Sequence, residues 1–496
     1  MRAYLSLCFL AFPLAAVAAG DALTIYSSAQ PGAIRPEQYR DDNGSAVPGY
    51  AVVRHLREIE LEKGRNTVRF SDVAALIDPT TVAFESLTDP KGTRVVEQSF
   101  QFDLVSTQKL LEKYIDRTIS VDQVRGSGVE TFRGTLLSTA GGFVLRRDDG
   151  SVQLLSHSAA VRLPELPGGL ITRPTLVWDI AAARGGKQRA RVSYQTGGMT
   201  WWADYNLAYS EGANANACKL DVGAWVSILN RSGAGYDEAK LKLVAGDVQR
   251  AAPPGYAGGR VPAARAITAE KVAGFEEKAF FEYHLYTLGR PTTLADRSTK
   301  QIELFPVARG VPCEKKLVYY GLATAWRGFS PNPITDRNVG VQSNKKIDVY
   351  LAFENSARNN MGMPLPAGRV RVSKLDDADG TLEFIGEDVI DHTPKDERVR
   401  IKLGSAFDVV GERRQIAFAV DTSRRTMSEQ IEVRLRNHKD QPVTVEVKEN
   451  LYRWVNWKIS QATDSYRKED ARTVIFPLRV AAGGEQVLRY TVDYSW

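Results

Sequence analysis

The sequence predicts an all-β, multi-domain protein built from β-sandwiches. Apolar and polar residues alternate along many short segments, as they do in strands with one buried face; clear examples are "RVVEQSFQFDL", "TVEVKENLYRW" and "EQVLRYTVDYSW". Turn sequences rich in Gly, Asp and Pro separate these segments, among them "DPKG" at 89–92, "ADG" at 378–380 and "AAGG" at 481–484. Many short strands with such turns are typical of sandwiches and small barrels.

The first residues have the pattern of a secretory signal peptide, which we assign to 1–19. Arg2 precedes an apolar stretch, and Ala16-Val17-Ala18 matches the small-x-small cleavage pattern. The apolar run is too short to span a bilayer, and no later segment is long enough. We therefore expect no transmembrane span in the mature chain, and a periplasmic or secreted location.

One helix is expected, in "STQKLLEKYIDR", with Ser106 or Thr107 as its N-cap. Its apolar residues recur at helical spacing: Leu110, Leu111, Tyr114 and Ile115. Five short strands follow within roughly sixty residues, which suits a small SH3-like or Sm-like barrel. We assign this helix and barrel to 106–165.

Three larger modules account for the rest of the chain. We expect an N-terminal β module over 20–105, a middle β domain over 170–344 and an immunoglobulin-like β-sandwich over 345–496. Within the middle domain, residues 251–272 are rich in Ala, Gly and Pro and have no periodic apolar face. Such a composition predicts a mobile loop.

Composition and charge exclude several partner classes. The formal net charge is only +6, and basic residues alternate with acidic ones instead of forming a block. This is not the signature of a nucleic-acid-binding protein, and the expected barrel lacks a basic-aromatic platform for RNA. We expect no cofactor, because the sequence lacks the phosphate-loop, zinc-protease and nucleophile-elbow motifs.

Cys218 and Cys313 are the two cysteines of the expected mature chain. Each begins an apolar, strand-like run, in "CKLDVGAWVSILN" and "CEKKLVYYGLATAW". An exported protein could join them in a disulfide, but the sequence equally allows two free, buried thiols. Their spacing does not match a zinc site, and no metal site is expected.

Two aromatic segments are candidate binding surfaces. In "TGGMTWWADY", one of Trp201 and Trp202 faces outward if the segment is a strand. In "LYRWVNWKI", Trp454 and Trp457 would be presented together by a bulge or turn. Exposed rings could bind a sugar or anchor a protein partner; the alternative is that they fill the core or a domain interface.

The stretch "GEDVIDHTPKDE", at 386–397, gathers carboxylates around one histidine. Asp391 and His392, with Glu387, are the candidate catalytic residues of a hydrolase. Adjacent residues of a strand point to opposite faces, however, and no calcium-loop pattern is present. The preferred interpretation is a turn between two strands. His284 could supply a general base, but no activated nucleophile motif accompanies it.

Long segments of the second half stand in a characteristic order: "VSYQTGGMTWWADYNLAY", "WVSILNRSGAGYDEAKLKLVAGDVQR", "FFEYHLYTLGRPTTLADRSTKQIELFP", "MPLPAGRVRV" and "IGEDVIDHTPKDERVRIKLGSAFDVVGERR". In these the chain resembles the bacterial domain of unknown function family 4139, over roughly 170–496 and less sharply over 50–170. The resemblance implies an exported, all-β product without an established activity, whose last two modules share strands. Distant relatives are described as mucoidy inhibitors and carry long coiled coils, but this chain has no heptad run.

Together these observations favour a non-enzymatic cell-envelope protein that binds a protein or a glycan through exposed aromatic residues. One alternative is an envelope hydrolase with a site around His392 and the adjacent carboxylates. Another is an outer-membrane-associated assembly or structural protein. The sequence does not predict the ligand, the pathway or the oligomeric state.

Overall fold

The computed structural model describes residues 20–26, 47–71, 73–102, 105–125, 128–165, 167, 170–246, 248, 275–322, 332–341 and 343–496. Within these ranges strands prevail, so the all-β prediction is confirmed. The predicted signal peptide and the predicted loop at 251–272 lie outside the described residues. No helix of the described part is both long and apolar enough to cross a membrane.

The first body is a sandwich of two sheets. The larger sheet follows the order β16-β17-β15-β1-β2-β12-β4, with β18 paired to β15. Its strands are β1 (Asp21–Tyr26), β2 (Tyr50–Leu61), β4 (Ile77–Ser86), β12 (Gly186–Thr196), β15 (Tyr236–Ala245), β16 (Phe275–Phe280), β17 (Tyr283–Leu288) and β18 (Thr292–Leu294). The smaller sheet consists of β3 (Gly64–Phe70), β11 (Thr175–Ala182) and β5 (Thr93–Gln101). Trp178 of β11 meets Phe84 of β4 between the layers, with ring centroids 5.5 Å apart.

The ladders of this body join segments that are far apart in the sequence. β1 pairs in parallel with β15, and β12 pairs with β2 along the whole length of β12. β11 lies between β3 and β5. The segment 20–105 therefore completes its sandwich with strands that come after residue 170, and 106–165 is inserted between β5 and β11.

The insertion carries the helix and the five strands that the sequence predicts. Ser106 caps α1 (Thr107–Lys113) by accepting a hydrogen bond from the Lys109 N–H at 3.2 Å. The strand order is β10-β6-β7-β8-β9, with β6 (Thr118–Arg125), β7 (Gly128–Ser138), β8 (Phe143–Arg146), β9 (Val152–Leu155) and β10 (Ala160–Arg162). No ladder joins β9 to β10 in the described residues. The sheet is therefore open, and the prediction of a barrel is wrong because its short last strand leaves the sheet unclosed.

A 13-stranded sheet forms the remainder of the chain. Its first part has the order β22-β21-β13-β14-β19-β20, with β13 (Met199–Glu211), β14 (Ala217–Asn230), β19 (Ser298–Tyr320), β20 (Lys346–Glu354), β21 (Gly368–Leu375) and β22 (Leu382–Ile390). A 3-10 turn, η3 (Ala357–Asn359), follows β20. β13 pairs in parallel with β21, so this part also combines segments from both sides of residue 345.

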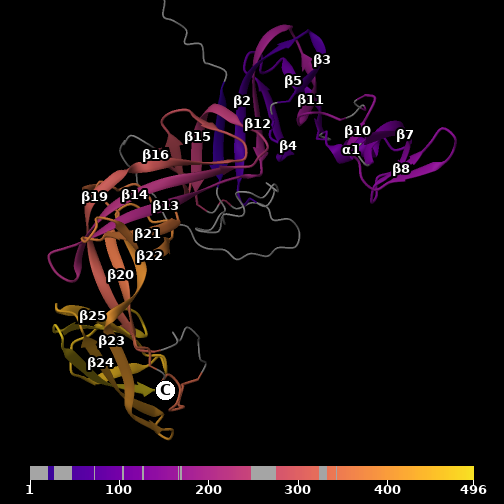
Figure 1. Ribbon diagram of the computed structural model, residues 1–496. Helices are drawn as coiled ribbons and strands as arrows, with labels where there is room; N and C mark the ends of the chain where they lie inside the picture. The colour runs from indigo at the N-terminus through magenta and orange to yellow at the C-terminus, as the bar shows by residue number, and fades with distance from the viewer. Residues whose placement is uncertain are drawn as a thin grey trace, which may run out of the picture.

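The C-terminal sandwich continues the same sheet. Its strands are β23 (Arg398–Asp421), β24 (Thr426–Asn437), β25 (Val443–Asn450), β26 (Trp457–Ala462), β27 (Arg467–Lys468), β28 (Thr473–Val480) and β29 (Glu485–Ser495). β19 pairs with β14, then with β20 and β25, and β23 pairs with β20 and then with β24. These two long strands run through both parts. The inserted module and the C-terminal sandwich lie at opposite ends of the elongated chain (Figure 1).

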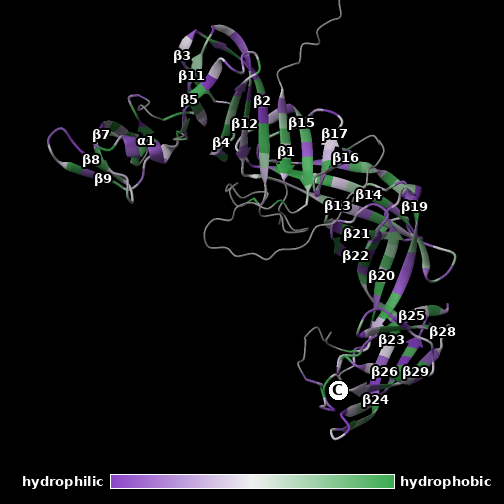
Figure 2. Cartoon of the chain, turned by 180° about the vertical axis from the view of Figure 1, so that it is seen from behind, coloured by the Kyte–Doolittle hydropathy of each residue, from purple (hydrophilic) through white to green (hydrophobic). Residues whose placement is uncertain are grey.

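The predicted alternation determines which residues fill the cores. On β29 the inward residues are Leu488, Tyr490, Val492 and Tyr494, each at most 2% exposed. Hydrophobic and hydrophilic residues alternate in the same way along other strands (Figure 2). One core joins the first body to the middle strands, a second fills the C-terminal sandwich, and a third lies inside the insertion.

Candidate functional site

The stretch 386–397 forms the end of β22 and the connection to β23, as the preferred interpretation expects. Glu387 faces Arg371, with Oε2 to Nε at 3.1 Å. The Nδ1 atom of the exposed His392 accepts a hydrogen bond from the Ala367 N–H at 3.0 Å. Asp391 is exposed, and its carbonyl accepts from the Thr393 hydroxyl. The three candidate catalytic residues therefore bind different partners, and within the described ranges no group of three His, Cys, Asp or Glu residues could hold a metal ion.

Cys218 and Cys313 form a disulfide between β14 and β19. The two residues are direct partners in the antiparallel ladder, with Cα atoms 4.8 Å apart. Strand pairing thus supplies the proximity that the sequence could not show. His284, the other histidine considered above, is held by Glu277, with Nδ1 to Oε1 at 2.7 Å.

The four candidate tryptophans occupy different environments. Trp201 is 2% exposed, and its indole N–H donates to the Val244 carbonyl at 3.3 Å. The prediction that Trp201 is a surface anchor is wrong, because its ring fills the core where β13 crosses the first body. Trp202 is half-buried, and its N–H donates to Asp204 at 2.7 Å. Trp454 and Trp457 are half-buried and pack on the core of the C-terminal sandwich.

Trp457 lines a hollow of about 740 Å³ at one end of this sandwich, which we call the Trp457 hollow. The hollow is lined by Ala419, Val420, Asp421, Thr426, Met427, Ser428, Val455, Asn456, Trp457, Lys458, Lys468, Asp493, Tyr494 and Ser495. The Trp457 N–H donates to the Ala471 carbonyl at 2.9 Å, which fixes the ring plane. The Lys468 amine lies over the ring, 4.8 Å from its centroid. Two lysines and two aspartates give the lining no net charge.

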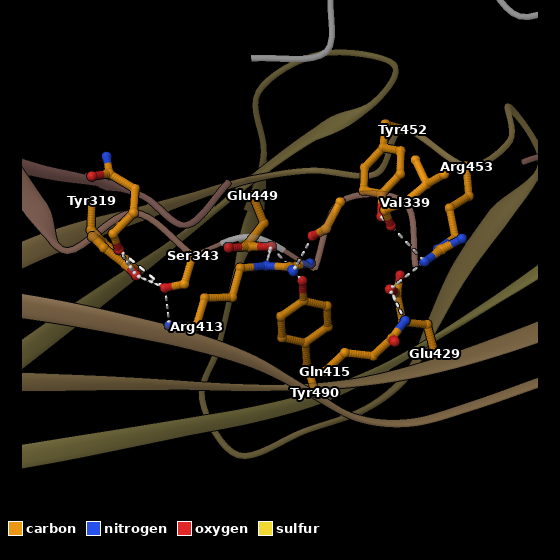
Figure 3. Close-up of polar contacts among 12 residues, drawn as sticks. Tyr319, Val339, Ser343, Arg413, Gln415, Glu429, Glu449, Tyr452, Arg453 and Tyr490 are labelled. Carbon is orange, nitrogen blue, oxygen red and sulfur yellow. Dashed lines mark hydrogen bonds and ion pairs between the residues drawn. The ribbon is translucent and has the colours of Figure 1, made fainter. Parts of the chain in front are cut away.

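A buried ion pair supports the walls of the hollow. Arg453 precedes the lining segment 455–458 and donates to Glu429 Oε1 at 3.1 Å; the two side chains are 0% and 2% exposed. Glu429 directly follows Ser428, which also lines the hollow. Arg453 also donates to the carbonyls of Ile334, Asp336 and Val339. Figure 3 shows its contacts with Glu429 and Val339. Because its charge has several partners, this guanidinium holds the segment before Trp457 in one position.

A second buried pair lies beside it. Arg413 Nε donates to Glu449 Oε2 at 2.9 Å, and the Tyr490 hydroxyl donates to the same oxygen at 2.6 Å (Figure 3). Burial lowers the pKa of Arg413, but the charges of Glu449, Tyr490 and Glu429 and the hydrogen bond to Glu449 together outweigh burial and raise this pKa well above its ordinary value. Burial also raises the pKa of Tyr490. Arg413 is therefore a permanently charged residue of the core, and its contact with Glu449 links β23 to β25.

Sequence reasoning missed these buried charges and also a second cavity, beside Asp21 and His55. Arg413, Glu449 and Arg453 lie in alternating segments whose polar residues we expected to face solvent. Asp21 and His55 are isolated in the sequence and become neighbours only because β1 pairs with β2. One signal was available: a charged residue at an inward position of an otherwise apolar face.

Comparisons with protein-family models, curated proteins and solved structures find no match to this chain. The resemblance to family 4139 therefore stays a prediction. The function has to be inferred from the geometry of the chain itself.

Proposed function

We propose that this chain is an exported cell-envelope protein that binds a neutral glycan in the Trp457 hollow, without catalysing a reaction. The observation that carries this proposal is the Trp457 ring, held by one hydrogen bond in a concave site beside polar side chains. Aromatic faces pack well on the apolar C–H faces of sugars, while nearby polar groups bind the hydroxyls. The hollow offers Asn456, Asp493 and Ser495 for the second task.

The charge of the hollow supports a neutral ligand. Lys458 and Lys468 balance Asp421 and Asp493. Asp493 Oδ1 accepts from the Ser428 hydroxyl at 2.6 Å, so this carboxylate is already oriented. The exposed Lys468 side chain can swing away from the Trp457 ring and place its amine on a sugar oxygen.

Two observations support the other parts of the proposal. The disulfide between Cys218 and Cys313 is a feature of chains that fold in oxidising compartments. Of the candidate catalytic residues, Glu387 is paired with Arg371 and His392 accepts a hydrogen bond from the Ala367 N–H. Because the two side chains have different partners, a binding role is favoured over hydrolysis.

Titration calorimetry of the purified protein with neutral oligosaccharides and soluble cell-wall glycan fragments tests the proposal. Trp457→Ala should weaken binding by about 2 kcal/mol or more, roughly thirtyfold, as for other aromatic anchors. Trp225→Ala is the matched control, because Trp225 is 39% exposed on β14, outside the hollow. Equal affinity in both variants, or capture of a protein and no glycan, would refute a glycan site here.

A further inference from the structure

A second cavity, of about 750 Å³, lies in the first body; we call it the Asp21 cavity. Its walls are β1, β2, the start of β15, the segment after β3 (Ser71, Val73 and Ala75) and the loops that precede β11, β15 and β19. Its charged lining residues are Asp21, Arg57, Arg173, Asp237, Asp296 and Arg297. Three carboxylates and three guanidiniums leave the lining without net charge, which fits a ligand that is neutral overall but carries charges of both signs.

The floor of the cavity is rigid. His55 is 2% exposed, with Nδ1 2.8 Å from Asp21 Oδ1 and Nε2 3.0 Å from the Tyr194 hydroxyl. The Ala74 N–H donates to that hydroxyl at 3.2 Å. Both ring nitrogens are therefore occupied, so His55 is a positioning residue here and not a free base.

Asp21 retains binding capacity. Its Oδ1 atom accepts from His55 and also from Arg57 at 2.8 Å, whereas Oδ2 has no partner among the described residues. The side chain is 12% exposed. Burial raises the pKa of this carboxyl, but the hydrogen bonds from His55 and Arg57 outweigh burial and lower it below 3.8. An ionised carboxylate with one unused oxygen is thus held at the cavity floor.

Tyr236 adds an independent observation. It lines the cavity and is 1% exposed; its hydroxyl lies near the hydroxyls of Ser232 and Tyr194 but makes a well-formed hydrogen bond to neither, nor to any other described residue. A buried polar group without a partner is unfavourable unless a bound molecule satisfies it. Its ring is too buried to stack on a sugar, so the cavity offers hydrogen bonds and charges in place of an aromatic platform.

We propose that the Asp21 cavity binds a small zwitterion, a free amino acid or a short peptide, whose ammonium group donates to Asp21 Oδ2. The carboxylate of the ligand then lies toward the rim, where the exposed Arg297 and Arg173 can approach it. Tyr236 also lines the cavity and supplies its hydroxyl to the bound molecule. This site is independent of the Trp457 hollow, and neither proposal depends on the other.

The experiment is titration calorimetry of the full chain with L-alanyl-L-alanine and with its N-acetyl derivative, which lacks the ammonium group. The dipeptide should bind, and the N-acetyl form should bind about tenfold more weakly or worse, since a charge-assisted hydrogen bond is lost. Asp21→Asn should weaken dipeptide binding to a similar extent. Asp179→Asn, which changes a surface carboxylate paired with Arg65, should leave it unchanged.

Tyr236→Phe is the second variant, because it keeps the ring and removes only the hydroxyl. It should weaken dipeptide binding while the protein stays folded. Absence of binding at millimolar dipeptide, equal affinity for the N-acetyl form, or full affinity in Asp21→Asn would each overturn the proposal. Dipeptide binding should also be compared between a chain that keeps residues 1–19 and a chain that starts at Gly20, because Gly20 lines the cavity. If only the longer chain bound the dipeptide, the terminal ammonium of Gly20 would be the occupant of the cavity, and the proposal would be overturned.

Discussion

Arg413 and Glu449 form a 2.9 Å ion pair inside the C-terminal sandwich, with side chains 3% and 1% exposed. Arg413 lies on β23, in the layer with β24, and Glu449 lies on β25, in the layer with β28. The pair therefore connects the two layers of the sandwich through the core. Glu449 Oε1 has no hydrogen-bond partner in the described residues, so the stability of this carboxylate depends on Arg413 and Tyr490.

Removing one charge of this pair should destabilise the sandwich strongly. Arg413→Met leaves the Glu449 carboxylate buried without a cation and should lower the free energy of unfolding by about 3–5 kcal/mol. The double variant Arg413→Met/Glu449→Leu should lose much less, since two apolar residues can replace a buried pair. Urea unfolding of both variants measures the difference. If the double variant were as unstable as the single one, the coupling between the two charges would be absent.

The disulfide should stabilise the middle strands by restricting the unfolded chain. Cys218 and Cys313 are 95 residues apart in sequence. Closing a loop of this length is worth at most about 4.7 kcal/mol, and disulfides typically deliver about 2–4 kcal/mol, which is the loss expected in Cys218→Ser/Cys313→Ser. Denaturant unfolding with and without reductant checks this: reductant should lower the midpoint of the wild type and leave that of the double variant unchanged. A wild-type midpoint insensitive to full reduction would contradict the prediction.

Asp21 should make the stability of the first body depend on acid pH. Its pKa is lower in the folded chain than the ordinary 3.8, so its contribution is fully present above that value and is lost as pH falls below it. The melting temperature of the wild type should therefore fall more than that of Asp21→Asn between about pH 5 and about pH 3. Thermal melts followed by circular dichroism measure both. Asp179→Asn is the control and should follow the wild type; parallel curves for all three would exclude this role for Asp21.

Two tyrosines of the same core should respond in opposite ways to loss of the hydroxyl. Tyr205 is 1% exposed and donates to the Pro366 carbonyl at 2.7 Å, so Tyr205→Phe should cost about 1–3 kcal/mol of unfolding free energy. Tyr236 is equally buried but its hydroxyl has no partner in the described residues, so Tyr236→Phe in the ligand-free protein should be neutral or stabilising. Urea unfolding of the two variants gives the comparison. A large loss in Tyr236→Phe would show that its hydroxyl is already satisfied within the fold.

Local features of the fold were predictable because they depend on near neighbours in the chain. The alternation around Tyr490 and Val492 gave the buried face of β29 correctly, and the cap at Ser106 gave the start of α1. The interpretation of 386–397 as a connection between strands is also correct, and this connection holds Pro394, which cannot donate to a strand ladder. Each of these depends on backbone geometry over a few residues.

The partners of each strand were not predictable in the same way. Alternation shows that β1 has a buried face. It does not show that β1 lies between β2 and β15, of which β15 is more than two hundred residues away in the sequence. The missing knowledge of strand partners also explains the wrong prediction for Trp201. Alternation in "TGGMTWWADY" predicts that one of the two tryptophans faces outward, and only the crossing of β13 over the first body decides that Trp201 is buried.

The sequence by itself determined the β class, the helix that Ser106 caps, the inward faces of the strands and the presence of two cysteines able to pair. The tertiary structure alone decided that Cys218 faces Cys313, that Asp21 meets His55, and that Arg453 and Glu429 support the Trp457 hollow. The physical reason is that side-chain direction follows from the local period of the backbone, whereas contacts between distant segments depend on strand order and register, which no short window of residues encodes.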